Sequence, residues 1–199
     1  MIDIIINFSI FLVTTILLLF LWLRTRKDTP RKFRESFRYF TCLSNILCSV
    51  SALIFAMARF TGAVSDLSWT LKYIGTAAVT VTMLTVFLFL APSVGKEWYH
   101  VLLKGPFNLF MHLLTPVMSL ISFCGFERRG MTFLQSLFGM LPVVLYGLLY
   151  LYKIIYASEP ERWNDFYGFN KDGKWPLMFA VMLSGTFAIC MGLMSIQNL

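Results

Sequence analysis

The chain has 199 residues, of which 58% are hydrophobic, 17% are aromatic and only 14% are charged, and its mean hydropathy is +0.72. Soluble domains carry about 25% charged residues, so this composition excludes an ordinary water-soluble globular protein. The net charge of +7 does not indicate nucleic-acid binding, because no basic surface interleaved with aromatic side chains stands outside the apolar stretches. The sequence therefore predicts an integral membrane protein.

Six apolar stretches are long enough to cross a bilayer, which takes roughly 20 helical residues. They are expected at about residues 4–23, 39–60, 73–91, 107–126, 132–152 and 176–196. No stretch between them is long enough for a soluble domain, and no internal repeat is evident. The predicted fold class is all-α: a single transmembrane domain over residues 1–199, built as a polytopic bundle of six transmembrane helices.

The first span is expected to be a retained helix and not a cleaved signal peptide. The segment before it contains Asp3 and no basic residue, and the segment that ends at Arg24 offers no small-residue cleavage site. Lys and Arg are concentrated in the loops after the first, third and fifth spans. The positive-inside rule then predicts that these loops are cytoplasmic and that both termini lie outside. The basic loops are also expected to attract anionic lipid head groups.

The second span opens with a polar face in an otherwise apolar segment. Arg38, Thr41 and Asn45 are spaced i, i+3 and i+7, so they share one side of a helix, and Ser44 precedes the asparagine. The simplest role for Arg38 is to extend its charge to the membrane surface, with binding of a substrate carboxylate as the alternative.

The fourth span contains His112, with Asn108 one turn before it. The sequence predicts that His112 is the one ionisable side chain well inside an apolar span. Charged groups at membrane depth cost about 2.5 kcal/mol or more on insertion scales, so such a residue indicates a functional site. Both this span and the second are expected to run outward from the cytoplasm, which places Thr41 and His112 at similar depths.

A hydroxyl beside a neutral imidazole is the minimal equipment for acyl transfer. Thr41 is the predicted nucleophile and His112 the predicted base. Asn45 and Asn108 are candidates for stabilising the oxyanion, with Ser44 behind them. Each residue also has a structural interpretation: membrane-helix Ser and Thr hydroxyls often bond back to the preceding turn, and Asn and His often link helices.

The segment from Phe37 to Thr41 resembles the aromatic, basic, aromatic, apolar, Thr pattern of the androgen-induced membrane hydrolases, the FAR-17a family. The segment Asn108-x-x-Met111-His112, followed by Pro116, is similar to the histidine segment of that family. The resemblance implies a helical membrane enzyme that hydrolyses fatty acid esters of hydroxy fatty acids with a threonine nucleophile and a catalytic histidine. The serine and asparagine after the threonine look more like bacterial six-helix relatives.

The function expected from these patterns is hydrolysis of a lipid ester within the membrane, without a metal or other cofactor. Two alternatives stay open: a pathway for protons or small solutes, and a non-catalytic lipid-binding protein. The four cysteines are expected to be small packing residues, because no spacing typical of a metal site or a disulfide framework occurs. Gly185 and Gly192 are expected to allow close helix packing, and Trp69 is expected at the membrane surface.

Overall fold

The computed structural model describes residues 1–28 and 35–199. Within these ranges the protein is helical, and six helices are long and apolar enough to cross a membrane. Their bounds are Ile2–Leu23, Phe40–Phe60, Asp66–His100, Pro106–Phe126, Phe133–Tyr156 and Trp175–Gln197. The prediction of a six-helix membrane bundle is confirmed. The basic residues between 29 and 34, expected to meet lipid head groups, lie outside the described residues.

Several spans consist of more than one regular segment. The α-helices that position the site are α1 (Ile2–Asp28), α3 (Phe40–Phe60), α4 (Asp66–Thr85), α7 (Pro106–Leu109), α8 (Thr115–Phe126), α10 (Leu141–Leu151) and α11 (Trp175–Gln197). Short segments α5 (Ala91–Val94), α6 (Trp98–Leu102) and α9 (Phe133–Leu137) lie near the ends of the bundle. Three π-helical turns interrupt the described spans: η1 (Val86–Leu90), η3 (Phe110–Leu114) and η5 (Tyr152–Tyr156).

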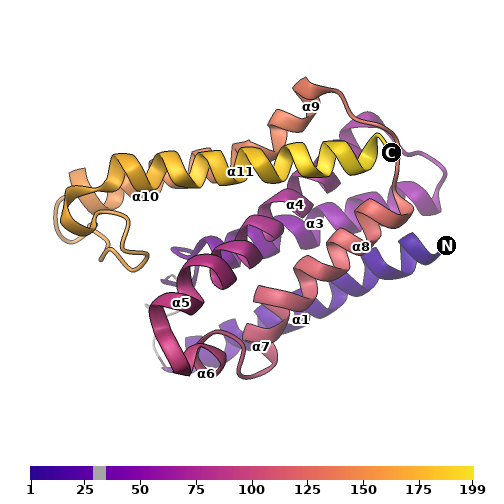
Figure 1. Cartoon of the computed structure of the whole chain (residues 1–199). Coiled ribbons are helices and arrows are strands. Elements are labelled where there is room, and N and C mark those ends of the chain that lie inside the picture. Colours follow the sequence, from indigo (N-terminus) through magenta and orange to yellow (C-terminus); the bar gives the residue numbers. More distant parts are fainter. Residues whose placement is uncertain (29–34) are drawn as a thin grey trace.

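Helices α1, α3, α4 and α8 form a closed ring in which each helix packs against two neighbours. Helices α10 and α11 lie beside one another and pack against α4 from outside this ring (Figure 1). Both chain termini lie at one end of the molecule, which we call the termini end (Figure 1). The opposite end, which carries the loop of residues 157–174, is called the loop end.

The interior of the four-helix ring contains many polar side chains beside two apolar clusters, whereas its outer surface is apolar. The buried polar side chains contributed by the ring helices include Asn7, Thr14, Asn45, Ser49, Lys72, Thr76, Thr115, Ser119 and Ser122. Large apolar side chains such as Leu12, Ile16 and Leu19 are exposed on the outside. This distribution suits a lipid environment, because exposed apolar groups are already solvated by lipid tails and polar groups must find partners inside.

The third span begins earlier than expected. Helix α4 starts at Asp66, where the Ser65 hydroxyl accepts from the Ser68 amide in a reciprocal capping box. The predicted start at Tyr73 was wrong. It was placed there because the charge of Lys72 marks the end of the apolar stretch in the sequence. The cap fixes the helix start two turns before that lysine, so Lys72 is carried into the bundle.

Trp69 lies one turn after the start of α4, and its side chain is covered by protein. Its side chain is buried against Tyr73 and Phe123, and its indole N–H donates to the Glu127 carbonyl at 2.9 Å. The early start of α4 places this indole between α4 and α8, where the Glu127 carbonyl after α8 supplies its acceptor.

The close helix approaches also differ from those expected. A Cβ added at Gly185 or Gly192 would meet nothing within 4 Å, whereas one added at Gly75 would lie 3.0 Å from Cys48 Cα. Gly139 and Gly147 are likewise crowded, by side chains of Tyr73 and Phe179. Small residues therefore allow close packing at the α3–α4 contact and beside α10, and not along α11. Cys42, Cys48 and Cys190 are buried and free, as expected of packing residues, and Cys124 is half-buried and free.

Candidate functional site

Thr41 is the second residue of α3 and is half-buried. In the described part of the chain, its hydroxyl forms no hydrogen bond to His112 or to a main-chain carbonyl. Thr76 and Thr80, by contrast, donate to the carbonyls four residues earlier, at 2.9 and 2.8 Å. The difference arises because α3 begins at Phe40, so there is no helical turn before Thr41 for its hydroxyl to bond back to. The Thr41 hydroxyl therefore makes no hydrogen bond to the main chain of its own helix.

Asn45 links the Thr41 turn to the helix that carries His112. Its amide nitrogen donates to the Thr41 carbonyl at 2.8 Å and to the Met111 carbonyl at 3.1 Å. Asn45 is fully buried, and its Oδ1 atom has no partner among the described residues. The two carbonyls use both N–H groups of the amide. Asn45 thus holds the two predicted catalytic segments together and has no spare donor in this arrangement.

His112 is half-buried and sits in the middle of the π-helical turn η3. Pro116 accounts for this turn, because proline has no N–H to donate to the His112 carbonyl and its ring clashes with that group. The helix instead closes a longer bond, from the Thr115 N–H to the Phe110 carbonyl. Single π turns of this kind are frequent at functional sites. Asn108, also half-buried, precedes this turn in α7.

Ser44 occupies the side of α3 that faces α4. Its hydroxyl donates to the Thr41 carbonyl at 3.2 Å and is 2.7 Å from the Thr82 hydroxyl. Two side chains, those of Ser44 and Asn45, therefore donate to the same carbonyl of Thr41. Because carbonyls near the start of a helix normally accept only the main-chain N–H four residues on, the two extra donors fix the position of this peptide strongly.

Arg38 and the start of α3 are covered by the loop of residues 157–174. The Arg38 guanidinium lies 5.7 Å from the centre of the Trp163 ring, within cation–π range. The Tyr146 hydroxyl donates to the Arg38 carbonyl at 2.6 Å, and the Phe40 N–H donates to the Tyr167 hydroxyl at 3.1 Å. Arg38 is thus held against protein at the loop end, close to the Thr41 turn.

Asp165 organises this covering loop. One of its carboxylate oxygens accepts from the Tyr150 hydroxyl at 2.9 Å and from the Phe169 N–H at 2.8 Å, and the other accepts from the Asn170 N–H at 2.7 Å. Burial raises the pKa of Tyr167, which packs in the same aromatic cluster, to about 12. The loop is therefore a packed cover with its own hydrogen bonds, which a polar and aromatic sequence alone did not distinguish from a solvated connector.

An apolar groove runs between α3 and α10 beside the Thr41 turn, with a cavity volume of about 280 Å³. The groove is lined by Phe40, Leu43, Ser44, Leu47, Pro142, Leu145, Tyr146 and Leu149. Ser44 is the only side chain of this lining that also contacts the Thr41 carbonyl among the described residues. The dimensions and lining suit an extended hydrocarbon chain.

The second polar region of the ring interior was missed by sequence reasoning. Lys72 is fully buried in α4, and its ammonium donates to the Ser119 hydroxyl at 3.1 Å. Glu127, just after α8, is also buried and accepts from Asn7 and Ser122. The prediction that His112 is the one ionisable side chain within the spans was wrong. The signal that could have revealed Lys72 was the Ser65 to Ser68 capping pattern, which places the lysine inside the helix.

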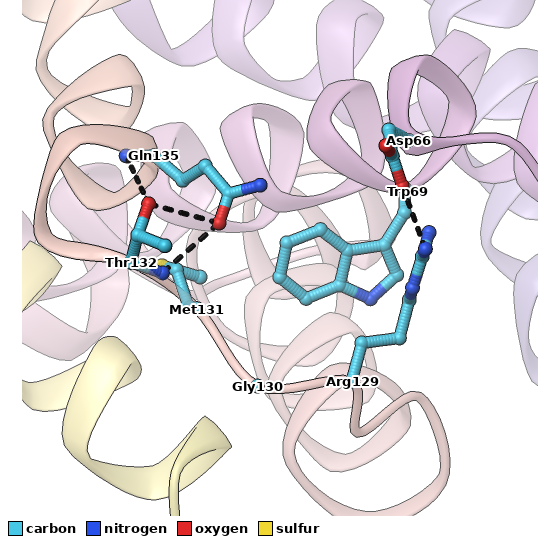
Figure 2. Close-up of a pocket in the computed structure, with 7 residues that line it drawn as sticks. All are labelled: Asp66, Trp69, Arg129, Gly130, Met131, Thr132 and Gln135. Atoms are coloured by element: carbon cyan, nitrogen blue, oxygen red, sulfur yellow. Dashed lines mark hydrogen bonds and ion pairs between the residues drawn. The ribbon is translucent and has the colours of Figure 1, made fainter.

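A pocket of about 370 Å³ opens at the termini end. It is lined by Asp66, Trp69, Arg129, Gly130, Met131, Thr132 and Gln135 (Figure 2). The Arg129 guanidinium binds the Asp66 carboxylate at 2.6 Å, and the Thr132 and Gln135 side chains cap the start of α9. These polar groups are already paired with each other, so the pocket presents no unpartnered charge to a ligand.

No family model, curated protein or solved structure matches this chain. The resemblance to androgen-induced hydrolases therefore stays a prediction. Within the described residues no group of three or more His, Cys, Asp or Glu side chains is placed to hold a metal ion. The geometry itself brings the Thr41 turn, Asn45 and the His112 turn together, with Ser44 and Arg38 beside them, and adds a separate buried centre at Lys72 and Glu127.

Proposed function

We propose that this protein hydrolyses lipid esters within the membrane, with Thr41 as nucleophile and His112 as general base. The observation that supports this most directly is the Asn45 amide, which bonds the carbonyls of Thr41 and Met111 and so joins the two candidate segments. The Thr41 hydroxyl is not used by a back-bond. A reactive pair needs this combination of a fixed backbone and an available hydroxyl.

In the proposed reaction, the neutral His112 imidazole takes the proton from Thr41 Oγ1 as that oxygen attacks the ester carbonyl carbon. The tetrahedral intermediate collapses, the C–O bond to the alcohol breaks, and the imidazolium returns the proton to the departing alkoxide. A water molecule, activated by the same imidazole, then hydrolyses the acyl-threonine and restores the hydroxyl. No metal or organic cofactor takes part in these steps.

The oxyanion donor is assigned to Asn108 in this proposal. Both N–H groups of the Asn45 amide are used by carbonyls, so Asn45 acts as a positioning residue. Asn108 lies four residues before His112 and on the same side of the helix. A preorganised donor of this kind contributes roughly 3 to 4 kcal/mol to the barrier reduction.

The groove between α3 and α10 is proposed to hold the acyl chain of the substrate. Ser44 is part of the groove lining and lies three residues after Thr41. An acyl chain in the groove would therefore end near the Thr41 hydroxyl. Arg38, held near Trp163, is positioned at the loop end to meet a carboxylate on the substrate. A fatty acid ester of a hydroxy fatty acid offers both an acyl chain and a carboxylate, and fits this arrangement.

The loop end is proposed to face the cytoplasm and the termini end the outside, because the loop end carries most of the lysines and arginines. In this orientation the ester lies near the inner leaflet, where anionic head groups meet the basic loops. Single cysteines placed at positions 62 and 171, with the four native cysteines replaced, test this through labelling by an impermeant maleimide. Labelling of position 171 in intact cells would reverse the orientation.

The hydrolase proposal is tested with a lipid-like fluorophosphonate probe and a panel of lipid esters. The purified wild-type protein is expected to be labelled and to hydrolyse at least one ester. Thr41→Ala and His112→Ala should abolish both activities. Thr186→Ala is the matched control, because this threonine donates to the Met182 carbonyl far from the site and should leave both unchanged.

Each alternative result is informative. Labelling at Ser119, whose hydroxyl accepts from Lys72, would keep the hydrolase class and reject Thr41 as nucleophile. A wild-type protein that is neither labelled nor active on the panel would reject hydrolysis. The second candidate, a pathway for protons or small solutes, would then explain the polar ring interior better, because buried ionisable groups such as Lys72 line such pathways. Binding of lipid without turnover would favour the non-catalytic alternative.

A further inference from the structure

The pocket at the termini end (Figure 2) has no part in the proposed hydrolysis, whose site lies at the other end of α3. Its lining comes from three spans close to their ends. Asp66 and Trp69 lie at the start of the third span, Arg129 follows the fourth, and Gln135 lies in the first turn of the fifth. Because a span covers the hydrocarbon core, its ends lie at the depth of the lipid head groups. The pocket is therefore placed to meet a head group.

The loop of residues 127–132, which forms one wall of the pocket, is fixed by side chains at the end of α11. Gln197 Oε1 accepts from the Arg129 N–H at 3.1 Å. Asn198 Oδ1 accepts from the Met131 N–H at 2.7 Å, and Asn198 Nδ2 donates to the Met131 carbonyl at 2.9 Å. These bonds give the wall its shape before a ligand arrives, and such preorganisation lowers the cost of binding.

The pocket carries one cationic and one anionic side chain, and both can form further hydrogen bonds. The Arg129 guanidinium donates to Asp66 Oδ1 at 2.6 Å and to the Ser65 carbonyl at 3.4 Å. These bonds use two of its five N–H donors. The guanidinium also lies 5.9 Å from the centre of the Trp69 ring, which supports it from one side. The Asp66 side chain is 84% exposed, and its Oδ2 atom bonds no described residue.

A third side chain, Gln135, directs its amide nitrogen into the pocket toward the Trp69 ring (Figure 2). Its Oε1 atom is used at the start of α9, where it accepts from the Thr132 N–H at 2.9 Å and from the Thr132 hydroxyl at 3.1 Å. This capping arrangement fixes the orientation of the amide. In the described part of the chain, Gln135 Nε2 donates to no acceptor. The pocket therefore offers donors from two side chains and one carboxylate oxygen.

We propose that this pocket binds the head group of a membrane phospholipid that carries both a phosphate and a primary ammonium. Arg129 and Gln135 donate to the phosphate oxygens, and the ammonium donates to Asp66. The two charges of the pocket balance each other, so a zwitterionic head group matches them, whereas a purely anionic one is repelled by Asp66. An exposed ion pair contributes little to stability, so the head group can replace each partner at small cost.

Exposed apolar side chains beside the pocket favour a lipid over a free phosphate ester. Leu67 follows Asp66 on α4, and Phe133 and Leu134 follow Thr132 on α9; all three apolar side chains are more than half exposed. The acyl chains of a lipid whose head group occupies the pocket can cover this apolar surface, which a water-soluble ester cannot do. The lipid belongs to the leaflet on the side of the termini. This inference does not depend on the hydrolase proposal.

Native mass spectrometry of the full-length protein in detergent micelles tests the site. Dioleoyl phosphatidylethanolamine and dioleoyl phosphatidylglycerol are titrated separately, and a dissociation constant is obtained for each lipid. Arg129→Gln should weaken binding of phosphatidylethanolamine about tenfold, because it removes charge-assisted hydrogen bonds to the phosphate. Arg128→Gln is the matched control: this neighbouring arginine is exposed, donates to the Cys124 carbonyl and does not line the pocket, so its replacement should leave the constant unchanged.

Asp66→Asn separates recognition of the ammonium from a purely structural ion pair. It keeps the shape of the side chain and removes its charge, so phosphatidylethanolamine should bind more weakly and phosphatidylglycerol more tightly than to the wild type. An unchanged ratio of the two constants overturns the proposal. So does an equal affinity of Arg129→Gln and Arg128→Gln for phosphatidylethanolamine. Asp66→Asn remains informative if Arg129→Gln does not fold.

Soluble phosphoethanolamine distinguishes a lipid from a free phosphate ester as the ligand. Added at the same concentration as phosphatidylethanolamine, it should leave the lipid bound, because it has no acyl chains to cover the apolar surface beside the pocket. Displacement of half of the lipid under these conditions would show that the two bind equally well, and would overturn the assignment of the pocket to a membrane lipid.

Discussion

Replacement of Gly75 by alanine is expected to disturb the contact between α3 and α4. A Cβ at this position would lie 2.2 Å from Ser51 Oγ and 3.0 Å from Cys48 Cα. The Ser51 hydroxyl can move, but it then loses its 3.0 Å bond to the Cys48 carbonyl, at about 1 kcal/mol. The Cys48 backbone must also withdraw by several tenths of an ångström, and overpacking of this kind costs about 1–3 kcal/mol.

These costs total about 2–4 kcal/mol. The higher helix propensity of alanine offsets about 1 kcal/mol. Gly75→Ala should therefore lower the free energy of unfolding by about 1–3 kcal/mol. Gly185→Ala is the matched control, since its Cβ would meet nothing within 4 Å, and it should be neutral or stabilising.

The assay is reversible unfolding in mixed detergent micelles, followed by circular dichroism, for wild type, both single variants and Gly75→Ala combined with Ser51→Ala. The double variant removes the closest contact but keeps the backbone overlap with Cys48, so it should recover only part of the loss. Equal stability of Gly75→Ala and Gly185→Ala would refute the reasoning that α3 and α4 meet through this glycine.

Further substitutions address the site and its cover. Asn45→Leu removes the donors to the Thr41 and Met111 carbonyls. It should lower the unfolding free energy by about 1–3 kcal/mol in the same assay. An unchanged value would show that the amide does not hold the two segments together. Asp165→Asn removes the charge that accepts two main-chain N–H groups, so proteolysis of the 157–174 loop should become faster than in the wild type. Pro116→Ala restores a donor for the His112 carbonyl, so the π turn should become regular helix and ester hydrolysis should fall; a solved structure of the variant checks the turn. Lys153 lowers the pKa of Glu161. The stabilisation from this ion pair is therefore present above the usual pKa of glutamate and is lost as the pH falls through the lowered pKa. Because Glu161 is fully exposed, solvent screens the ion pair and its stabilisation is small. Glu161→Gln should therefore leave the melting temperature at pH 7 unchanged.

The buried polar interior has a consequence for how the bundle is stabilised. In lipid, helix association gains little from the hydrophobic effect and depends on packing and on hydrogen bonds between helices. Thr14 on α1 is 3.3 Å from Thr115 on α8, and Lys72 on α4 reaches Ser119 on α8. The same groups that form the candidate sites therefore also hold the four-helix ring together, so substitutions there require a stability measurement beside each activity measurement.

The sequence by itself determined the membrane class, the number of spans and the polar face of Thr41 and Asn45 on the second span. These features depend on composition and on periodicity within one helix, which are local properties. The paired bonds of Asn45 to its own helix and to Met111 show the limit of this reasoning: the residue type indicated a hydrogen-bonding role, but its second partner lies 66 positions along the chain.

Only the tertiary structure decided which polar groups share the interior. Lys72 was expected at a span boundary, yet the capped start of α4 and the hydroxyl of Ser119 allow it to be fully buried. Gly75 lies at a close helix contact because α3 packs against the face of α4 that carries it. Gly185 faces open space. Burial of a charged side chain is tolerated only where a neighbouring helix supplies a hydrogen-bond partner, and a glycine aids packing only where a neighbouring helix approaches closely. Both neighbours are set by how the helices pack.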